Sequence, residues 1–230
     1  RLVAFQIAIG LAVLVNAVYV VKQRVDKINR PNGMDVENMI VVASAGFAKD
    51  FDYDASWRED LATIRGLPGV KAASLVSNIP LSGGGSSSGY QAEPGELNPD
   101  TVVEANTFSV DEQGVAALGL TLSSGRVFEA HEILPADVDW ESAPQAIVTQ
   151  ALAKALFPKD RNALGKTFYD GLNTPITIIG IIENMHGSWV GWDKVDHVML
   201  FPRIKSGPNG VYLVRTEPGR RDAIMRTIEE

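Results

Sequence analysis

The sequence predicts an α+β protein that consists of an N-terminal transmembrane helix followed by a domain of two parts. Three observations predict this class: residues 2–21 carry no charge, residues 39–77 follow a strand, helix, strand pattern, and residues 89–196 alternate short apolar runs with many turn residues. A strand and helix pattern returns near the C-terminus. We therefore expect an outer α/β unit into whose sequence a strand-rich part is inserted.

The composition is that of a folded, acidic protein without thiol chemistry. Of the 230 residues, 45% are hydrophobic and 21% are charged, and the formal net charge is -7. Binding to nucleic acid requires clustered lysine and arginine, which this sequence lacks, so no nucleic-acid partner is expected. The chain has no cysteine, which excludes disulfides, thiolate catalysis and cysteine-based zinc sites.

Residues 2–21 are a candidate membrane span. As a helix with a rise of about 1.5 Å per residue, this uncharged stretch reaches about 30 Å, which matches the hydrocarbon core of a bilayer. The alternatives, a buried core helix and the apolar region of a signal peptide, are usually shorter, and no small-residue cleavage site precedes the basic flank. One helix face gathers small and polar residues, which favours packing against other membrane helices over a lone anchor in lipid: Gln6, Gly10, Val13 and Ala17, with Asn16 near their edge.

The charges beside the span leave its orientation open. Four basic residues follow it, and the positive-inside rule alone would place them in the cytoplasm: Lys22, Arg24, Lys27 and Arg30. The sequence opens on Arg1 without an initiator Met, so we expect that a preceding flank is missing. The comparison of charges on the two sides of the span therefore has only one side. We assign residues 1–30 to the transmembrane helix and its extension.

The outer unit begins with a strand at residues 39–45 and continues with a helix at residues 57–65, for which Ser56 is the expected N-cap. Three apolar residues recur at helical spacing and should face the core: Trp57, Leu61 and Ile64. A strand at residues 70–77 completes a unit that is compatible with a right-handed crossover between parallel strands.

The C-terminal segment repeats half of this pattern. Residues 198–201 and 211–215 are expected to be strands of the outer unit, and Pro218 opens a helix that carries Ile224. A further strand is expected after Glu230, so we expect the chain to be cut at both ends.

The inserted part contains short strands and one clear helix. We expect strands at residues 101–107, 146–149 and 176–182, and a helix at residues 150–157. Gly180 should mark a bulge or a close contact in the last of these strands.

Three glycines and three serines, residues 83–88, raise the question of a phosphate loop or a nucleophile. A phosphate loop needs a lysine and a following helix, but no lysine lies between Lys71 and Lys154, and the segment after the run is strand-like. A nucleophile elbow needs a strand-to-helix turn, and no feature ties a histidine base to these serines. We interpret the run as a flexible connection between the outer unit and the insertion.

The histidines and nearby carboxylates match no metal motif. The residues considered are His131, His186, His197, Glu183, Asp193 and Asp196. Their spacing fits neither a zinc-protease helix nor a calcium loop, so the carboxylates are interpreted as a solvated face. We assign no catalytic, cofactor-binding or metal-ligating residue.

The segment Trp189-Val190-Gly191-Trp192 permits two interpretations. Aromatic pairs in a glycine-containing loop can anchor a partner. Packing of one tryptophan into the core is the interpretation that burial habits favour.

Several stretches in order resemble one known family. They are LATIRGLPGVKAASLVSNIPLSGGGSSSGY at residues 61–90, AIVTQALAKALFPKDRNALGKTF at residues 146–168, ITIIGIIENMHG at residues 176–187, and VMLFPRI followed by VYLVRTEPG. Over residues 33–230 the chain is similar to the MacB-like periplasmic core domain of FtsX-like ABC transporter permeases. The resemblance implies an α/β porter-like unit at residues 31–84 and 197–230, the second part truncated, and a strand-rich sabre-like subdomain inserted at residues 85–196.

The resemblance also implies a function. The chain would be the non-enzymatic extracytoplasmic part of a permease in the bacterial inner membrane, with the main domain in the periplasm or outside the cell. Its implied partners are an ABC ATPase subunit or domain, a second permease copy in a homodimer or related heterodimer, a possible periplasmic adaptor and membrane lipid. ATPase-driven motion would drive export or substrate remodelling.

A different class remains open as an alternative. The chain could be a singly anchored extracytoplasmic module that binds a ligand or acts as a sensor. Three more long apolar stretches beyond Glu230 would indicate the permease, and none would indicate the anchored module.

Overall fold

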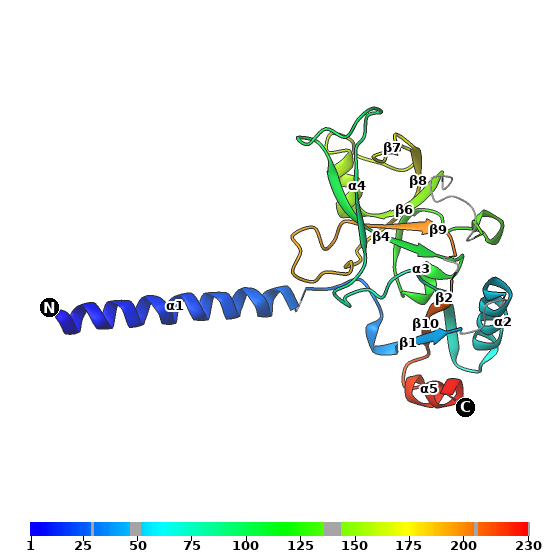
Figure 1. Cartoon of the computed structure of the whole chain (residues 1–230), viewed down its shortest axis with the longest axis horizontal. Coiled ribbons are helices and arrows are strands. Elements are labelled where there is room, and N and C mark those ends of the chain that lie inside the picture. Colours follow the sequence, from blue (N-terminus) through cyan, green and yellow to red (C-terminus); the bar gives the residue numbers. More distant parts are fainter. Residues whose placement is uncertain (29, 47–51, 136–143, 205–206, 230) are drawn as a thin grey trace. The chain divides into compact units, whose positions relative to one another are not determined.

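The structure, a computed structural model, describes residues 1–28, 30–46, 52–135, 144–204 and 207–229. The chain divides into two compact units, Arg1–Pro31 and Asn32–Glu230. Figure 1 shows the helices and strands along the chain.

The first unit contains one long helix, α1 (Leu2–Ile28). Within it, Leu2–Asp26 is long and apolar enough to cross a membrane, with a mean hydropathy of 2.2, and none of its apolar window is buried. The helix predicted at residues 2–21 is confirmed. It continues for about two further turns past that stretch.

The second unit contains a three-stranded sheet in the order β1-β10-β2. Its strands are β1 (Met39–Ala45), β10 (Asn209–Thr216) and β2 (Val70–Leu75), and β10 runs antiparallel to both neighbours. β1 and β2 are therefore parallel, as the strand, helix, strand pattern predicts, with β10 between them. Helices α2 (Tyr53–Gly66) and α5 (Arg221–Glu229) contribute to the same hydrophobic cluster as this sheet.

Helix α2 begins four residues earlier than the sequence predicts. Its N-cap is Asp52, whose carboxylate accepts a hydrogen bond from Ala55 N at 3.0 Å, and the predicted cap Ser56 lies inside the helix. The N-cap predicted at Ser56 is therefore wrong, because Asp caps a helix about as well as Ser does and the helix begins earlier. The predicted core face is confirmed by three buried residues: Trp57, Leu61 and Ile64.

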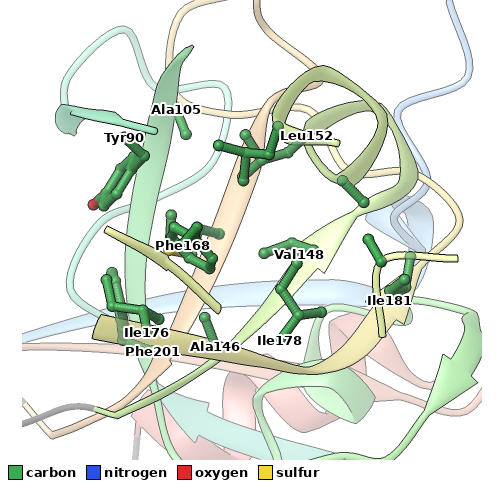
Figure 2. Close-up of a cluster of buried hydrophobic side chains, with 14 residues drawn as sticks. Tyr90, Ala105, Ala146, Val148, Leu152, Phe168, Ile176, Ile178, Ile181 and Phe201 are labelled. Atoms are coloured by element: carbon green, nitrogen blue, oxygen red, sulfur yellow. The ribbon is translucent and has the colours of Figure 1, made fainter. Parts of the chain in front are cut away.

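A seven-stranded sheet forms the larger part of the second unit. Its order is β3-β4-β9-β6-β8-β5, with β7 paired to β8. The strands are β3 (Ser86–Tyr90), β4 (Val103–Val110), β5 (Leu122–Gly125), β6 (Gln145–Thr149), β7 (Thr167–Tyr169), β8 (Pro175–Ile182) and β9 (Val198–Pro202). A bridge between Gln91 and Tyr169 joins the end of β3 to β7, so the sheet curls toward closure. Helix α4 (Gln150–Leu156) adds side chains to the core that Figure 2 shows.

Strand β9 corrects one prediction. The strand expected at residues 198–201 exists, but it was assigned to the outer unit, and this sheet assignment is wrong. β9 runs parallel to β4 and antiparallel to β6 in the larger sheet, and all five of its residues are buried. A short apolar run indicates a strand that is buried on both faces, but it does not show which strands lie beside it. The boundaries drawn between the two parts stay a prediction.

The other elements lie close to where the sequence predicts them. Helix α4 and strands β4, β6 and β8 match the expected segments within a few residues. A Cβ at Gly180 of β8 would meet Arg126 O and the Ile147 side chain, which confirms the predicted close contact. The short helical segments are η1 (Val36–Asn38), α3 (Gly114–Ala117) and η2 (Ala130–Glu132).

The two sheets share a hydrophobic core. Val76, just after β2, and Leu213 of β10 belong to the same cluster as Phe108, Val110 and Leu200 of the larger sheet. Because buried side chains pack at crystal-like density, displacement of one sheet strains the other. The sheets therefore form one packed body.

Candidate functional site

The glycine and serine run carries the chain from the smaller sheet to the larger one. Ser86, Ser87 and Ser88 form most of strand β3, which pairs with β4 in antiparallel register. The run therefore lies at the predicted passage between sheets, but its serines are strand residues and not a loose connection. Pairing with β4 satisfies the backbone groups on one edge of β3, and this outweighs the weak strand preference of serine and glycine.

The glycine half of the run is held by a second loop. Gly83 has a φ of +83° and donates from its N–H to Ser188 O at 2.9 Å. A Cβ at Gly85 would meet the Ser188 side chain, so only glycine allows this approach. The loop that enters β3 is thus fixed against residues 187–188.

A groove of about 410 Å³ lies beside β3. Its lining is rich in hydroxyl and amide groups: Ser77, Asn78, Ser86, Ser87, Ser88, Tyr90, Thr107, Ser109, Phe201 and Arg203. Asn78 Nδ2 donates to Thr107 O at 3.3 Å, and Ser109 N donates to Ser77 Oγ at 2.9 Å. Such a lining offers hydrogen bonds to a polar ligand. The assignment of no catalytic residue stays a prediction.

Tyr90 joins this groove to the core of the larger sheet. Its ring packs edge-to-face on Phe168 with centroids 5.6 Å apart, and Figure 2 shows the two side chains together. Burial raises the pKa of the Tyr90 hydroxyl, and the nearby Asp170 carboxylate raises it further, while the Ser88 hydroxyl acts in the opposite direction. Tyr90 therefore remains protonated and offers a hydrogen-bond donor, not a base.

The three histidines do not assemble a metal centre in the part of the chain that the structure describes. His131 is exposed and lies 3.4 Å from Glu129, His186 is buried, and His197 Nδ1 lies 3.2 Å from Glu104 O. Neither Glu183 nor Asp193 belongs to a cluster of possible metal ligands within the described ranges.

The tryptophan segment forms a tight turn. Trp192 N donates to Trp189 O at 3.0 Å, and the two rings meet edge-to-face with centroids 5.8 Å apart. Both rings are half-buried and Val190 between them is exposed, so the expectation that one ring is a core residue is wrong. The two rings pack edge-to-face on each other instead, and both remain partly open to solvent.

An ion-pair cluster joins the two sheets at a point that the sequence did not reveal. Arg65 at the end of α2 contacts Asp111 at 2.9 Å and Glu112 at 2.8 Å, just after β4. The Asp111 carboxylate also accepts from Leu75 N of β2 at 3.3 Å. Because 46 residues separate Arg65 from Asp111, their pairing depends on the tertiary fold and could not be predicted from a local sequence motif.

The comparisons with known proteins match the architecture. A family described as the MacB-like periplasmic core domain matches residues 2–230. The chain belongs to this family. The resemblance inferred from the sequence motifs is confirmed, and the domain is the periplasmic domain of a MacB-like ABC transporter permease. A search of curated proteins gave no match.

Two solved structures are similar to this MacB-like domain at low sequence identity. The periplasmic region of MacB from Actinobacillus actinomycetemcomitans has a TM-score of 0.51 and 16% identity, and the match covers 88% of this chain and 85% of that chain. The extracellular domain of the ABC-type transporter YknZ from Gram-positive bacteria has a TM-score of 0.48 and 16% identity, over 81% of this chain and 88% of that chain. The MacB likeness supports the fold.

Proposed function

We propose that this MacB-like domain is a non-catalytic relay in the bacterial inner membrane. Helix α1 crosses the membrane, the body of residues 32–230 lies in the periplasm or outside the cell, and ATP hydrolysis elsewhere moves that body to drive export or substrate remodelling. The observation that carries the proposal is a family match that includes both the apolar helix and the folded body.

The packing of the body supports a relay. A relay must transmit displacement without absorbing it, which requires stiff connections. The shared hydrophobic cluster and the Arg65 ion pairs both tie the smaller sheet to the larger one. Motion delivered to the body at Asn32 is therefore passed on by a unit that moves as a whole.

The partners follow from this role. An ABC ATPase subunit or domain supplies the energy, which the family match supports. A second permease copy completes a homodimer or a related heterodimer, and a periplasmic adaptor is a further partner. The small and polar face of α1, with Gln6 and Gly10, supports packing against other membrane helices.

Distance measurements in the assembled transporter test the relay. Residues 1–230 contain no cysteine, so once cysteines elsewhere in the transporter are replaced, a Ser87→Cys label on each of two copies reports the distance between their bodies. The distance should change on ATP addition and stay constant when the ATPase cannot hydrolyse. A second label pair within one body, at Ser87 and Lys71, which are both exposed, should not change. A constant distance between bodies during ATP turnover would refute the relay.

The hydroxyl-lined groove favours a second candidate, a singly anchored ligand-binding or sensor module. The gene downstream of Glu230 separates the two candidates. Further long apolar segments support the permease, whereas their absence together with an independent folded effector domain supports the sensor.

A further inference from the structure

Strand β3 lies at one end of the larger sheet. It pairs with β4 on one side, and the order of strands ends with it on the other. On that open side, the ladder contact within the described residues is the bridge between Gln91, just after β3, and Tyr169 of β7. Gln91 N donates to Tyr169 O at 3.0 Å, and Tyr169 N donates to Gln91 O at 2.8 Å. The side of β3 that faces away from β4 is its open edge, and β7 covers this edge only at its end.

Backbone alternation shows which groups the open edge presents. Successive residues of an antiparallel strand direct their N–H and C=O groups to opposite neighbours. Gln91 directs both groups toward β7, so Gly89 and Ser87 direct theirs to the same side, away from β4. Within the described residues, no hydrogen bond reaches these groups. Ser87 is exposed and Gly89 is half-buried, so the open edge offers backbone donors and acceptors.

Strand β7 does not continue along this edge because the chain turns directly after it. The Asp170 carboxylate accepts hydrogen bonds from Leu172 N at 2.9 Å and from Thr174 N at 2.8 Å. This local turn leads the chain into β8. No described segment therefore pairs with Ser87 on the side away from β4.

The groove of about 410 Å³ runs along the open edge. Three consecutive residues of β3 line it: Ser86, Ser87 and Ser88. Successive side chains of a strand point to opposite faces, so a groove lined by all three extends around the edge of β3 and not over one face alone. Most residues of the lining carry a hydroxyl group, and none carries a carboxylate. Hydroxyl groups both donate and accept, as do the amides of a peptide.

Tyr90 adds a buried donor to this groove. Its side chain is 0% exposed, and within the described residues its hydroxyl has no hydrogen-bond partner. The Ser88 hydroxyl lies near it, but not in hydrogen-bonding geometry. Figure 2 shows the Tyr90 hydroxyl on the side of the ring that faces away from Leu152 and Val148. A buried hydroxyl without a partner is unfavourable, so an acceptor on a bound ligand would satisfy it.

We propose that the groove binds an extended peptide segment, which adds to the larger sheet as an antiparallel strand at the open edge of β3. The peptide backbone exchanges hydrogen bonds with Ser87 and Gly89, and these open groups favour a peptide because they repeat at the spacing of a strand. The peptide side chain opposite Ser88 lies on the same face as Tyr90 and brings an amide or carboxylate acceptor to its hydroxyl. The inference concerns residues 32–230 alone and depends neither on the membrane crossing nor on ATPase-driven motion.

Fluorine NMR of the whole chain in detergent micelles tests the proposal. The protein is labelled with 3-fluorotyrosine, and the Tyr90 signal is assigned with Tyr90→Phe. Tyr212 of the smaller sheet, whose hydroxyl donates to Asp60 at 2.6 Å, is the internal reference. The probe is the acetylated and amidated peptide Thr-Val-Asn-Val-Thr. Its matched control carries a methyl group on both valine nitrogens, which keeps the side chains and removes the donors opposite Ser87 and Gly89.

Two variants separate the backbone of Ser87 from its side chain. Ser87→Pro removes the N–H that faces away from β4, and proline is tolerated at such an edge position. Ser87→Ala removes the hydroxyl and keeps the N–H and C=O groups. The difference in peptide affinity between the two variants therefore measures the backbone contribution. Near-ultraviolet circular dichroism verifies that each variant is folded, and the methylated peptide makes the same test on the unchanged protein.

The expected result is a saturable shift of the Tyr90 signal at millimolar peptide, with the Tyr212 signal unchanged. Affinity should fall about tenfold or more for the methylated peptide, and for Ser87→Pro relative to Ser87→Ala. Equal affinity of the two peptides, or no shift at all, would overturn the proposal. A Tyr90 shift that grows with protein concentration in the absence of peptide would assign the edge to a second copy and would also overturn it. None of these outcomes changes the test of the relay by distances between bodies.

Discussion

Asp111 is the residue at which burial, charge and connection between sheets coincide. Its side chain is 1% exposed, and it accepts hydrogen bonds from Arg65, Leu75 N and Gln113 N. Burial raises the pKa of this carboxyl, and the Arg65 guanidinium opposes that rise. An unpaired charge at this depth is strongly unfavourable, so the ionised carboxylate depends on its partners.

Removal of the guanidinium should weaken the junction of the sheets. Arg65→Ala is expected to lower the free energy of unfolding by about 2 kcal/mol at pH 7, less than for a fully buried pair because Arg65 is 24% exposed. Urea denaturation measures the change. Arg58→Ala, an exposed arginine on the same helix, is the control and should change stability by less than about 0.5 kcal/mol.

The loss at Arg65→Ala should depend on pH. A carboxyl whose pKa is higher in the folded than in the unfolded state favours folding when protonated, and this contribution is lost as the pH rises through the folded pKa. Without Arg65 the pKa of Asp111 rises further, so the variant recovers stability on acidification. The difference from the wild type should therefore shrink between pH 7 and pH 4, and a constant difference would show that the charge of Asp111 is not involved.

Helices and strands could be predicted from local sequence patterns more reliably than single side-chain contacts. The crossover pair β1 and β2, helix α4 and strand β8 could be predicted because periodicity and turn residues are local properties. The sheet to which β9 belongs could not, because its apolar residues fit a central position in either sheet. The serines of β3 likewise form a strand and not the predicted flexible connection, since pairing with β4 outweighs composition.

The cap of α2 gives a test at the level of one helix. Asp52→Ala removes the carboxylate that accepts from Ala55 N and should cost about 1 kcal/mol, whereas Ser56→Ala inside the helix should cost only a few tenths. Thermal unfolding of the two variants side by side measures this. Equal losses of stability in the two variants would contradict the assignment of the cap to Asp52.

The entry to β3 gives a second test. Gly85→Ala introduces a Cβ that meets the Ser188 side chain and should destabilise the protein by about 1 to 3 kcal/mol. Gly84→Ala is the matched control, since a Cβ there meets nothing within 4 Å and its φ is not in the left-handed region. Urea denaturation of both variants checks the prediction, which fails if they lose the same stability.

For the whole molecule, the class and the family were accessible from the sequence. The membrane helix was predicted from the length of the uncharged stretch before Lys22, and the family was predicted from ordered motifs that span both sheets. Neither prediction depends on the exact position of a single element. The contacts between loops were not accessible. His186 N donates to Asn32 O and Leu81 N donates to Gly187 O, so segments more than one hundred residues apart meet, and only the fold places them side by side.

Accessibility of one introduced cysteine tests the arrangement of the whole molecule most directly. Ser87→Cys is exposed on β3, whereas Ser74→Cys is fully buried and serves as the control. In intact cells, or in spheroplasts where an outer membrane blocks access, a membrane-impermeant thiol reagent should label the first variant and should label the second only after denaturation. Labelling of Ser87→Cys only after lysis would place the domain in the cytoplasm and contradict the account.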